Sequence, residues 1–297
     1  MNIGFIGLGI MGSPMVENLL KGGETVYVND VNEAAIHKLL PLGAIAAKNY
    51  EDLAENCELI ILMLPNAPII KTVLFGEKGL ANFLRPGTIV VDMSSLSPVD
   101  TKEIYEKLQV QQVKYLDAPV SGGQPKAVDG TLSIMVGGCE QALQKVKEAL
   151  QHMAGDIVYV GESGSGSTTK LANQILVNVT IAALSEAAVL ASKAGVDLNK
   201  LHAAIRNGLA GSAVLDAKLP LIIDRNFVAG GRIDINLKDL NNVAQTGEQL
   251  GVALPLTTSV IDMFEKLKED GKVAEDHCGL VQYYEKVSNY EIPKGGK

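Results

Sequence analysis

The sequence predicts an α/β fold class: a doubly wound, largely parallel sheet domain followed by an all-α C-terminal domain, joined by a long interdomain helix. Three observations support this prediction. Short apolar runs alternate with helical patterns in the first half, a Gly/Ser cluster at 161–167 ends the alternation, and helical patterns follow it. Such alternation is typical of βαβ units, whose parallel sheet carries helices on both faces.

The expected elements of the first half follow in chain order. Strands are expected at 2–6, 25–29, 58–64, 88–92, 113–116, 132–136 and 157–160, and helices at about 11–22, 32–40, 50–55, 67–74, 97–108 and 139–152. Leu59 to Leu64 is continuously apolar, as expected of a strand that is buried on both faces.

The second half is expected to contain helices at 168–194, 198–208, 213–224, 237–250, 256–270 and 274–288. The boundary near 163 divides the chain into a nucleotide-binding domain (1–163) and a helical substrate and oligomerisation domain (164–297). The 168–194 helix is apolar or small on nearly all sides, whereas a surface helix shows a single apolar stripe. We therefore expect this helix to be buried between domains or subunits, and the chain to form a homodimer or homotetramer.

Gly7, Gly9 and Gly12 fit the G-x-G-x-x-G pattern, with an apolar strand before it and a helix after it. In that pattern the first glycine permits a tight turn, the second lets a pyrophosphate approach the backbone, and the third lets the helix pack against the strand. The sequence thus predicts a Rossmann-type domain. Its candidate pyrophosphate-binding segment is Gly7, Leu8, Gly9, Ile10, Met11 and Gly12.

Asp30 ends the next apolar run, where a carboxylate can accept hydrogen bonds from a ribose diol. Val31 follows, where a protein that prefers NADP often has an Arg for the 2′-phosphate. We therefore expect NAD(H) as the preferred cofactor, with NADP(H) possible. The alternative is that the glycines only form a strand–helix turn and Asp30 only caps the next helix.

Further cofactor contacts are expected where later strands end. Pro65 stops the run that ends at Leu64, and Asn66 opens a loop on the side where ligands of such sheets lie. Ser95 follows another strand and is a candidate for the ribose or nicotinamide side of the cofactor. The alternative for Ser95 is an N-cap for the helix that opens near Pro98.

Lys170 is the candidate proton donor. It lies one turn into the long helix and shares a helix face with Asn173, three residues later. A lysine beside a cleft can protonate a carbonyl oxygen as hydride reaches the carbon, and its pKa shifts readily on burial. Asn173 can hold the lysine or the substrate hydroxyl in place. Spacing alone does not exclude a solvated lysine.

Two further segments are candidates for substrate binding. Ser121, Gly122 and Gly123 follow a strand, and consecutive N–H groups there could form a nest for a carboxylate, although a plain turn fits the composition as well. Lys238 and Asp239 are expected at the start of a helix. Lys238 could supply a cation near the cofactor or substrate, although a surface Lys–Asp pair is the simpler interpretation.

Composition excludes several classes of protein. The net charge of −8 and the absence of a basic patch argue against nucleic-acid binding. The three cysteines and four histidines show no metal-ligand spacing, so no metal site is expected. We expect a cytoplasmic protein, because no signal peptide precedes the first strand and the apolar 171–192 stretch contains polar residues that are costly in lipid.

Four separated blocks resemble the β-hydroxyacid dehydrogenase family, in the family's order and over nearly the whole chain. The blocks are 4–15, 117–123, 166–173 and 238–240. The resemblance implies that Lys170 is the catalytic acid/base and that Ser121, Gly122 and Gly123 hold a substrate carboxylate. It also implies that Asn173, Lys238 and Asp239 line the site and that Ser95 contacts NAD.

Within this family, one subgroup is similar at 121–132, 208–212, 215–218 and 283–286. That subgroup reduces tartronate semialdehyde to D-glycerate, so a small carboxylate semialdehyde or its hydroxyacid is the expected substrate. Val31 departs from the subgroup, which can carry Arg there. The alternatives are 3-hydroxyisobutyrate dehydrogenase and glyoxylate or succinic semialdehyde reductases of the same family.

Overall fold

The computed structural model describes residues 1–296, which form two compact units that divide between Lys170 and Leu171. Strands of the first unit are β1 (Asn2–Ile6), β2 (Thr25–Asn29), β3 (Ile45–Ala46), β4 (Leu59–Leu62), β5 (Ile89–Asp92), β6 (Lys114–Asp117), β7 (Val120–Ser121), β8 (Leu132–Gly138) and β9 (Ala154–Gly161). Its helices are α1 (Gly12–Lys21), α2 (Glu33–Leu39), α3 (Tyr50–Asn56), α4 (Ala67–Phe75), α5 (Pro98–Val110), α6 (Gly123–Asp129) and α7 (Glu140–Gln151), with 3-10 turns η1 (Leu40–Leu42) and η2 (Leu80–Asn82).

The strands form one sheet in the order β3-β2-β1-β4-β5-β6-β8-β7, with β9 paired to β8. Neighbours from β3 to β6 are parallel, whereas β8 runs antiparallel to β6 and β7. The order 3-2-1-4-5-6 is that of the Rossmann fold, and ligands bind where it reverses, beyond the carboxyl ends of β1 and β4.

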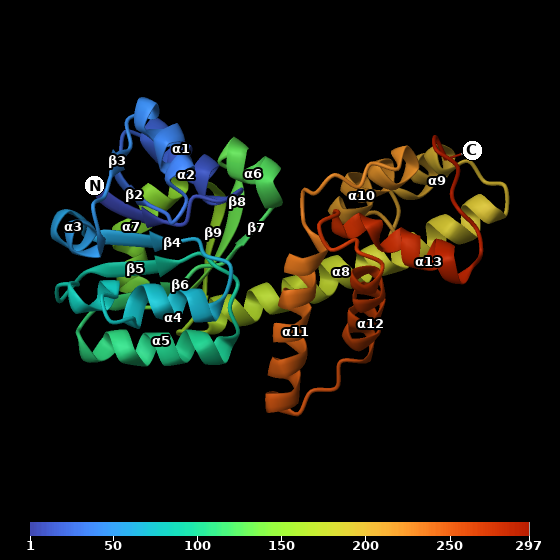
Figure 1. Ribbon diagram of the computed structural model, residues 1–297. Helices are drawn as coiled ribbons and strands as arrows, with labels where there is room; N and C mark the ends of the chain where they lie inside the picture. Colours follow the sequence, from blue (N-terminus) through green and yellow to red (C-terminus); the bar gives the residue numbers. More distant parts are fainter. Residues whose placement is uncertain (297) are drawn as a thin grey trace. The chain divides into compact units, whose positions relative to one another are not determined.

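Helices cover both faces of this sheet, as expected of a doubly wound domain (Figure 1). One core lies between a sheet face and helices α1, α2, α6 and α7. A second core lies between the opposite face and helices α3, α4 and α5. The four residues of β4 are all buried, which explains why that run is continuously apolar.

The second unit is helical. Helix α8 (Ser165–Lys193) begins in the first unit and continues into the second, which adds α9 (Leu198–Ile205), α10 (Ala213–Asp224), α11 (Ile233–Leu250), α12 (Pro255–Glu269), the 3-10 turn η3 (His277–Leu280) and α13 (Val281–Val287). Within 171–296 no strand forms, and one isolated bridge joins Arg232 to Asp276. Apolar residues of α8 pack with α11 and α12 in one core and with α10 and α13 in another.

Two of the segments that differ from the sequence-based expectation contain predicted site residues. The segment from Val120 onward, expected as a loop, is the short strand β7 followed by α6, whose C-cap Gly130 has φ +67°. Helix α11 begins at Ile233 and not at 237, so Lys238 and Asp239 lie in its second turn. The pattern from Ile233 to Leu237 alternates like a strand, but burial of Ile233, Leu237 and Leu240 follows the helical period.

Helix α8 is long and apolar enough to cross a membrane by length and composition alone. Several polar side chains within it are nevertheless buried, among them Gln174, Asn178 and Ser185. Ile181 and Ala182 belong to the apolar core of the helical unit. One side of α8 therefore packs in the core of the helical unit.

Candidate active site

The glycine-rich turn between β1 and α1 shows a separate reason for each glycine. Gly7 has φ +102°, and a Cβ there would lie 2.2 Å from the Met63 carbonyl oxygen. A Cβ on Gly12 would lie 1.9 Å from the Gly7 carbonyl oxygen. No atom lies within 4 Å of a Cβ built on Gly9. Packing thus requires the first and third glycines, while the second leaves open space into which a ligand can approach the backbone.

Asp30 lies beside this turn at the end of β2. Its Oδ2 accepts the Leu8 N–H at 2.6 Å and its Oδ1 accepts the Asn32 N–H at 2.7 Å. Asn32, not Asp30, caps α2 by accepting the Ala34 N–H. Each carboxylate oxygen keeps a second lone pair for a hydroxyl donor, so the fixed carboxylate suits a ribose diol.

Helix α1 begins without a side-chain cap, because its N-cap residue is Met11. The first N–H groups of a helix have no partner inside the helix, and the positive end of the helix dipole lies there. A pyrophosphate satisfies both features. The turn, the uncapped helix and Asp30 together fit a dinucleotide.

Loops after β4 and β5 are tied together at the same edge of the sheet. The Leu64 N–H donates to Ser94 Oγ at 2.9 Å, and the Ser94 N–H donates to Asp92 Oδ1 at 2.9 Å. Asp92 Oδ2 accepts the Tyr115 hydroxyl at 2.9 Å. Burial raises the pKa of the Asp92 carboxyl to about 6. Asp92 therefore fixes both loops in which the sequence predicts cofactor contacts.

Helix caps account for some polar residues of these loops. Asn66 caps α4, since its side chain accepts the Ile69 N–H at 3.0 Å. Ser97, not Ser95, caps α5 by accepting the Asp100 N–H at 3.1 Å. The capping alternative considered for Ser95 is therefore wrong. Its contact with NAD and that of Leu64, Pro65 and Asn66 remain predictions.

The Ser121–Gly123 segment follows β6 and leads into α6. Ser121 pairs with Ser133 of β8, and both following glycines have positive φ, +135° for Gly122 and +66° for Gly123. A Cβ on Gly122 would lie 2.6 Å from Cδ of Lys126. Only glycine fits this backbone without strain, and it turns successive N–H groups in a way that suits an anion.

The start of α8 is anchored to the carboxyl end of β6. Asp117 accepts the Gly164 N–H at 2.9 Å and the Ser167 N–H at 2.8 Å, and burial raises the pKa of this carboxyl. A Cβ on Gly166 would lie 2.3 Å from the Asp117 carbonyl oxygen, so the helix packs directly on the strand. Lys170 follows one turn later and is only 9% exposed. A fully solvated lysine is therefore excluded.

The helical unit brings three predicted residues into one polar cluster. Asn173 donates to Gln174 Oε1 at 3.3 Å, and Gln174 donates to Asp239 Oδ2 at 2.7 Å. Lys238 Nζ lies 3.0 Å from Asp239 Oδ1. Asp239 is 3% exposed, so the Lys–Asp pair is not the solvated surface pair of the simpler interpretation.

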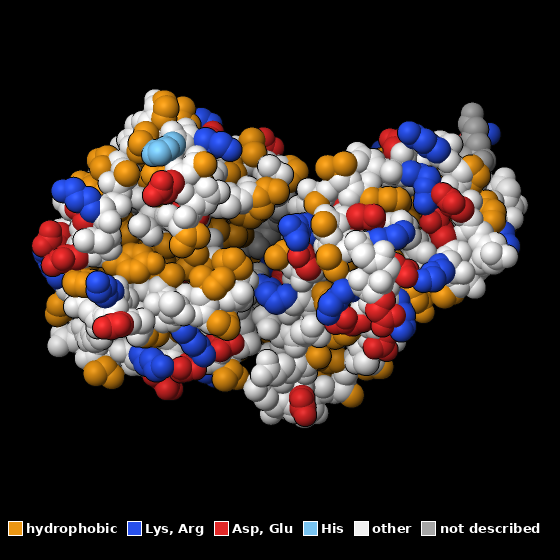
Figure 2. Space-filling model, viewed as in Figure 1, with side chains coloured by type: hydrophobic (Ala, Val, Ile, Leu, Met, Phe, Trp, Pro, Cys, Tyr) orange, Lys and Arg blue, Asp and Glu red, His pale blue; other side chains and the backbone are white. Residues whose placement is uncertain are grey.

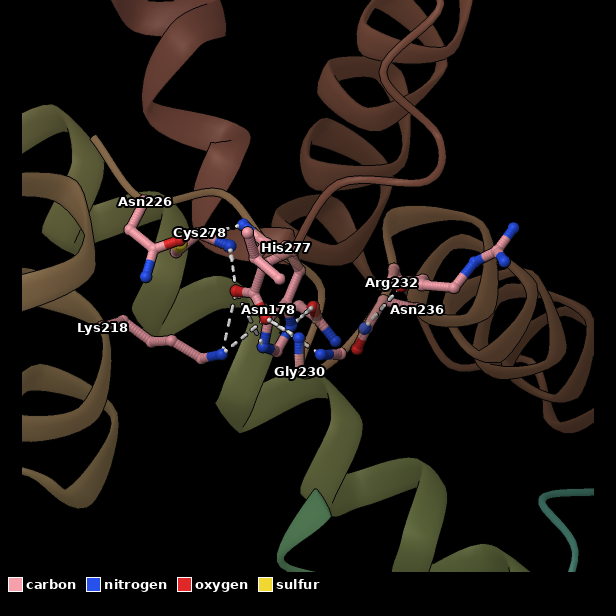
Figure 3. Close-up of polar contacts among 11 residues, drawn as sticks. Asn178, Lys218, Asn226, Gly230, Arg232, Asn236, His277 and Cys278 are labelled. Atoms are coloured by element: carbon pink, nitrogen blue, oxygen red, sulfur yellow. Dashed lines mark hydrogen bonds and ion pairs between the residues drawn. The ribbon is translucent and has the colours of Figure 1, made fainter. Parts of the chain in front are cut away.

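A second polar cluster holds the loop that precedes α11 (Figure 3). Asp276 is fully buried. It accepts a hydrogen bond from the Lys218 ammonium at 2.9 Å and from the Gly230 and Gly231 N–H groups at 3.0 and 2.9 Å. Burial alone would raise the pKa of Asp276, but the Coulombic effect of His277 and hydrogen bonds from the Cys278 N–H and Lys218 outweigh it and lower the pKa to about 2.

Sequence reasoning missed Gln174, Asp92 and Asp276 as organisers of these clusters. A signal for Gln174 was present, since 170, 174 and 178 are polar at helical spacing within an apolar segment. The partners of Gln174 on α11 lie 62 and 65 residues away in sequence, and the partner of Asn178 on η3 lies 99 residues away. Spacing along one helix does not identify such partners.

Charge and metal-ligand groups add two observations. Acidic and basic side chains are interspersed over the helical unit on the face drawn in Figure 2. Across residues 1–296, no group of three His, Cys, Asp or Glu side chains is placed to hold a metal ion.

Comparison with known proteins identifies the family. Residues 2–161 match the NAD-binding domain of 6-phosphogluconate dehydrogenase, and residues 164–284 match the domain described as NAD-binding of NADP-dependent 3-hydroxyisobutyrate dehydrogenase. The 2-hydroxy-3-oxopropionate reductase of Escherichia coli K12 is 40% identical, over 98% of this chain and 100% of the relative. The chain belongs to the β-hydroxyacid dehydrogenase family.

Other members of the family match over similar lengths. The 2-(hydroxymethyl)glutarate dehydrogenase of Eubacterium barkeri is 36% identical, over 99% of this chain and 98% of the relative. The crystal structure of a 3-hydroxyisobutyrate dehydrogenase from Salmonella typhimurium has a TM-score of 0.86 and 31% identity, covering 95% of this chain and 99% of that one. This β-hydroxyacid dehydrogenase is therefore an NAD(P)-dependent oxidoreductase acting on CH–OH groups.

Proposed function

We propose that this β-hydroxyacid dehydrogenase reduces tartronate semialdehyde to D-glycerate with NADH. The observation that carries the proposal is the 40% identity, over the full length, to 2-hydroxy-3-oxopropionate reductase. Relatives named for L-threonate and 2-(hydroxymethyl)glutarate are 30–36% identical. Each of these three kinds of enzyme is named for a small hydroxycarboxylate or the corresponding carbonyl compound. Each substrate therefore carries a carboxylate that the enzyme must bind.

In this proposal the cofactor lies along the carboxyl edge of the sheet. The N–H groups at the start of α1 bind the pyrophosphate, and Asp30 accepts hydrogen bonds from the ribose diol. Val31 is fully exposed and carries no charge that could attract a 2′-phosphate, while the Asp30 carboxylate would repel it. Both features favour NADH over NADPH. The bound nicotinamide supplies the hydride.

Substrate binding and proton transfer are proposed for separate groups. Ser121, Gly122 and Gly123 bind the substrate carboxylate through the hydroxyl and the N–H groups that the positive φ angles turn together. Asn173, Lys238 and Asp239 line the remainder of the site. Lys170 Nζ donates a proton to the aldehyde oxygen as hydride reaches its carbon, a role that typically accelerates a reaction by about 10²–10⁴-fold.

We also propose a cytoplasmic homodimer or homotetramer. One side of α8 carries an exposed apolar stripe, with Leu176 70% and Leu190 73% exposed. The stripe consists of Ala172, Leu176, Ala183, Ala187 and Leu190. A contiguous apolar stripe on a soluble protein is typical of a subunit contact. We further propose that residues 1–163 bind the nucleotide and that residues 164–297 bind the substrate and form the subunit contacts.

The test is a kinetic panel on the full chain. Tartronate semialdehyde, methylmalonate semialdehyde, glyoxylate, succinate semialdehyde, L-threonate and 2-(hydroxymethyl)glutarate are compared, each with both nicotinamide cofactors in the appropriate oxidation state. We expect kcat/KM for tartronate semialdehyde with NADH to exceed every other value at least tenfold. Comparable kcat/KM across the panel, or a preference for NADPH, would contradict the assignment.

A further inference from the structure

Gln174 occupies an unusual place in α8. It is 6% exposed in a helix whose neighbouring buried residues are mostly apolar, and it lies one residue after Asn173 and four after Lys170. Burying a primary amide is costly unless its donors and acceptor are satisfied. The side chain must therefore have specific partners.

Those partners are residues for which a role in substrate binding is proposed, together with one neighbour. The Gln174 amide nitrogen donates to Asp239 Oδ2 at 2.7 Å and to Asn236 Oδ1 at 3.3 Å. The Gln174 amide oxygen accepts from Asn173 at 3.3 Å. Asn236 is itself fixed, because its amide donates to the Arg232 carbonyl oxygen at 2.9 Å; Figure 3 shows it beside Arg232.

This pattern fixes which end of the amide faces which helix. A carboxylate can only accept, so the Gln174 NH₂ group must face Asp239 and its oxygen must face Asn173. Asp239 in turn lies 3.0 Å from the Lys238 ammonium through its other oxygen. One amide thus connects the polar residue of α8 to the Lys–Asp pair of α11.

We propose that Gln174 is a positioning residue of the reductase site: it holds Asp239, and through it Lys238, in register with Asn173. The inference rests on the proposed function, since it assigns meaning to those three residues as lining the substrate. Displacing groups that orient a substrate by about 1 Å can lower a rate about 10²-fold. Loss of Gln174 should therefore affect turnover of the semialdehyde more than binding of the nucleotide.

Two substitutions test the inference. Gln174→Met keeps the length of the side chain and removes its hydrogen bonds. Gln174→Glu keeps the shape but replaces the donor by a second carboxylate facing Asp239. Asn178→Leu is the matched control, because Asn178 is a buried amide of the same helix that contacts the Gln174 carbonyl oxygen and His277, not the three proposed substrate residues. Melting temperature, the Kd for NADH and kcat/KM for tartronate semialdehyde are measured for all three.

We expect kcat/KM to fall at least tenfold in Gln174→Met and further in Gln174→Glu, with the Kd for NADH within twofold of wild type. Asn178→Leu should lower the melting temperature and leave kcat/KM within threefold. A kcat/KM within threefold of wild type in both Gln174 variants, or losses that merely follow melting temperature across all three, would overturn the inference.

Failure of the proposed function looks different. A wild-type chain that reduces no semialdehyde of the panel counts against that function and leaves the kinetic comparison without a signal. The inference is then decided by a crystal structure of Gln174→Met. Altered Asp239 and Asn173 side-chain rotamers would support it, and unchanged rotamers would overturn it.

Discussion

At the residue scale, the three glycines of the first turn separate folding from binding. Gly12 packs against the Gly7 carbonyl oxygen, whereas a side chain on Gly9 would meet no protein atom within 4 Å. The sequence pattern predicts all three glycines but does not rank them, because the contacts that exclude a Cβ come from Met63, just after β4, and from the turn itself. Only the folded structure distinguishes a glycine needed for packing from one that leaves a surface open.

The prediction is a contrast between two alanine variants. Gly9→Ala should leave the melting temperature within about 2 °C and raise the Kd for NADH at least tenfold, because the added methyl group occupies the approach of the pyrophosphate. Gly12→Ala should lower the unfolding free energy by about 2 kcal/mol or more through overpacking. Thermal melts and NADH fluorescence titrations measure both effects. Unchanged NADH affinity in Gly9→Ala would argue against a dinucleotide at this turn.

Asp92 gives a second prediction at this scale. Its pKa is raised to about 6 by burial, from an ordinary value near 3.8. The folded state therefore binds a proton more tightly than the unfolded state, and this group lowers stability as the pH rises from about 4 to 6. Asp92→Asn keeps an acceptor for the Ser94 N–H and removes the ionisation.

We expect the unfolding free energy of Asp92→Asn, relative to wild type, to rise by up to about 3 kcal/mol between pH 4 and pH 7, since each pKa unit corresponds to about 1.4 kcal/mol. Denaturant titrations at several pH values measure the difference. Parallel pH dependence of the two proteins would show that Asp92 ionises normally in the folded state.

At the scale of elements, the sequence predicts the alternating half well because each strand and helix carries its own periodic signal. It fails where a short segment follows its neighbours: β7 forms only by pairing with β8, and α11 starts four residues early because Ile233 packs in the helical core. The polar residues of α8 are visible in the sequence, yet Gln174 finds its partners 62 and 65 residues away. Long-range pairing of this kind is set by the fold.

The contacts of Asp276 with Lys218 and with the loop before α11 give a prediction at the scale of elements. Its pKa is lowered to about 2, so its ionised form stabilises the folded state above the ordinary pKa, and that contribution disappears as the pH falls from about 4 to 2. Asp276→Asn leaves Lys218 without its buried counter-ion.

We expect Asp276→Asn to lower the unfolding free energy at pH 7 by about 3 kcal/mol, the usual size for breaking a buried pair. The deficit should shrink below pH 4. Lys266→Ala, which breaks the exposed pair with Glu269, serves as the control. We expect no measurable change in its unfolding free energy. If Asp276→Asn changes the unfolding free energy as little as Lys266→Ala does, the buried Asp276 contacts do not stabilise the fold.

At the scale of the whole molecule, the proposed assembly rests on the exposed apolar side of α8. Leu176→Glu combined with Leu190→Glu places two charges on that side without touching a buried residue. We expect the wild-type chain to elute as a dimer or tetramer, and the double variant as a monomer, in size-exclusion chromatography with light scattering. A monomeric wild type, or an unchanged oligomer in the variant, would contradict assembly through α8.

The proposed mechanism depends on the ammonium group of Lys170, which lies one turn beyond the point where α8 is anchored to β6. Lys170→Met removes the proton donor while keeping an apolar stem of similar length, and single-turnover hydride transfer to tartronate semialdehyde, measured alongside the Kd for NADH, tests its role. The account predicts a rate lowered at least 100-fold with the Kd for NADH within threefold. A variant that retains more than a tenth of the wild-type rate would show that Lys170 is not the acid in this reaction.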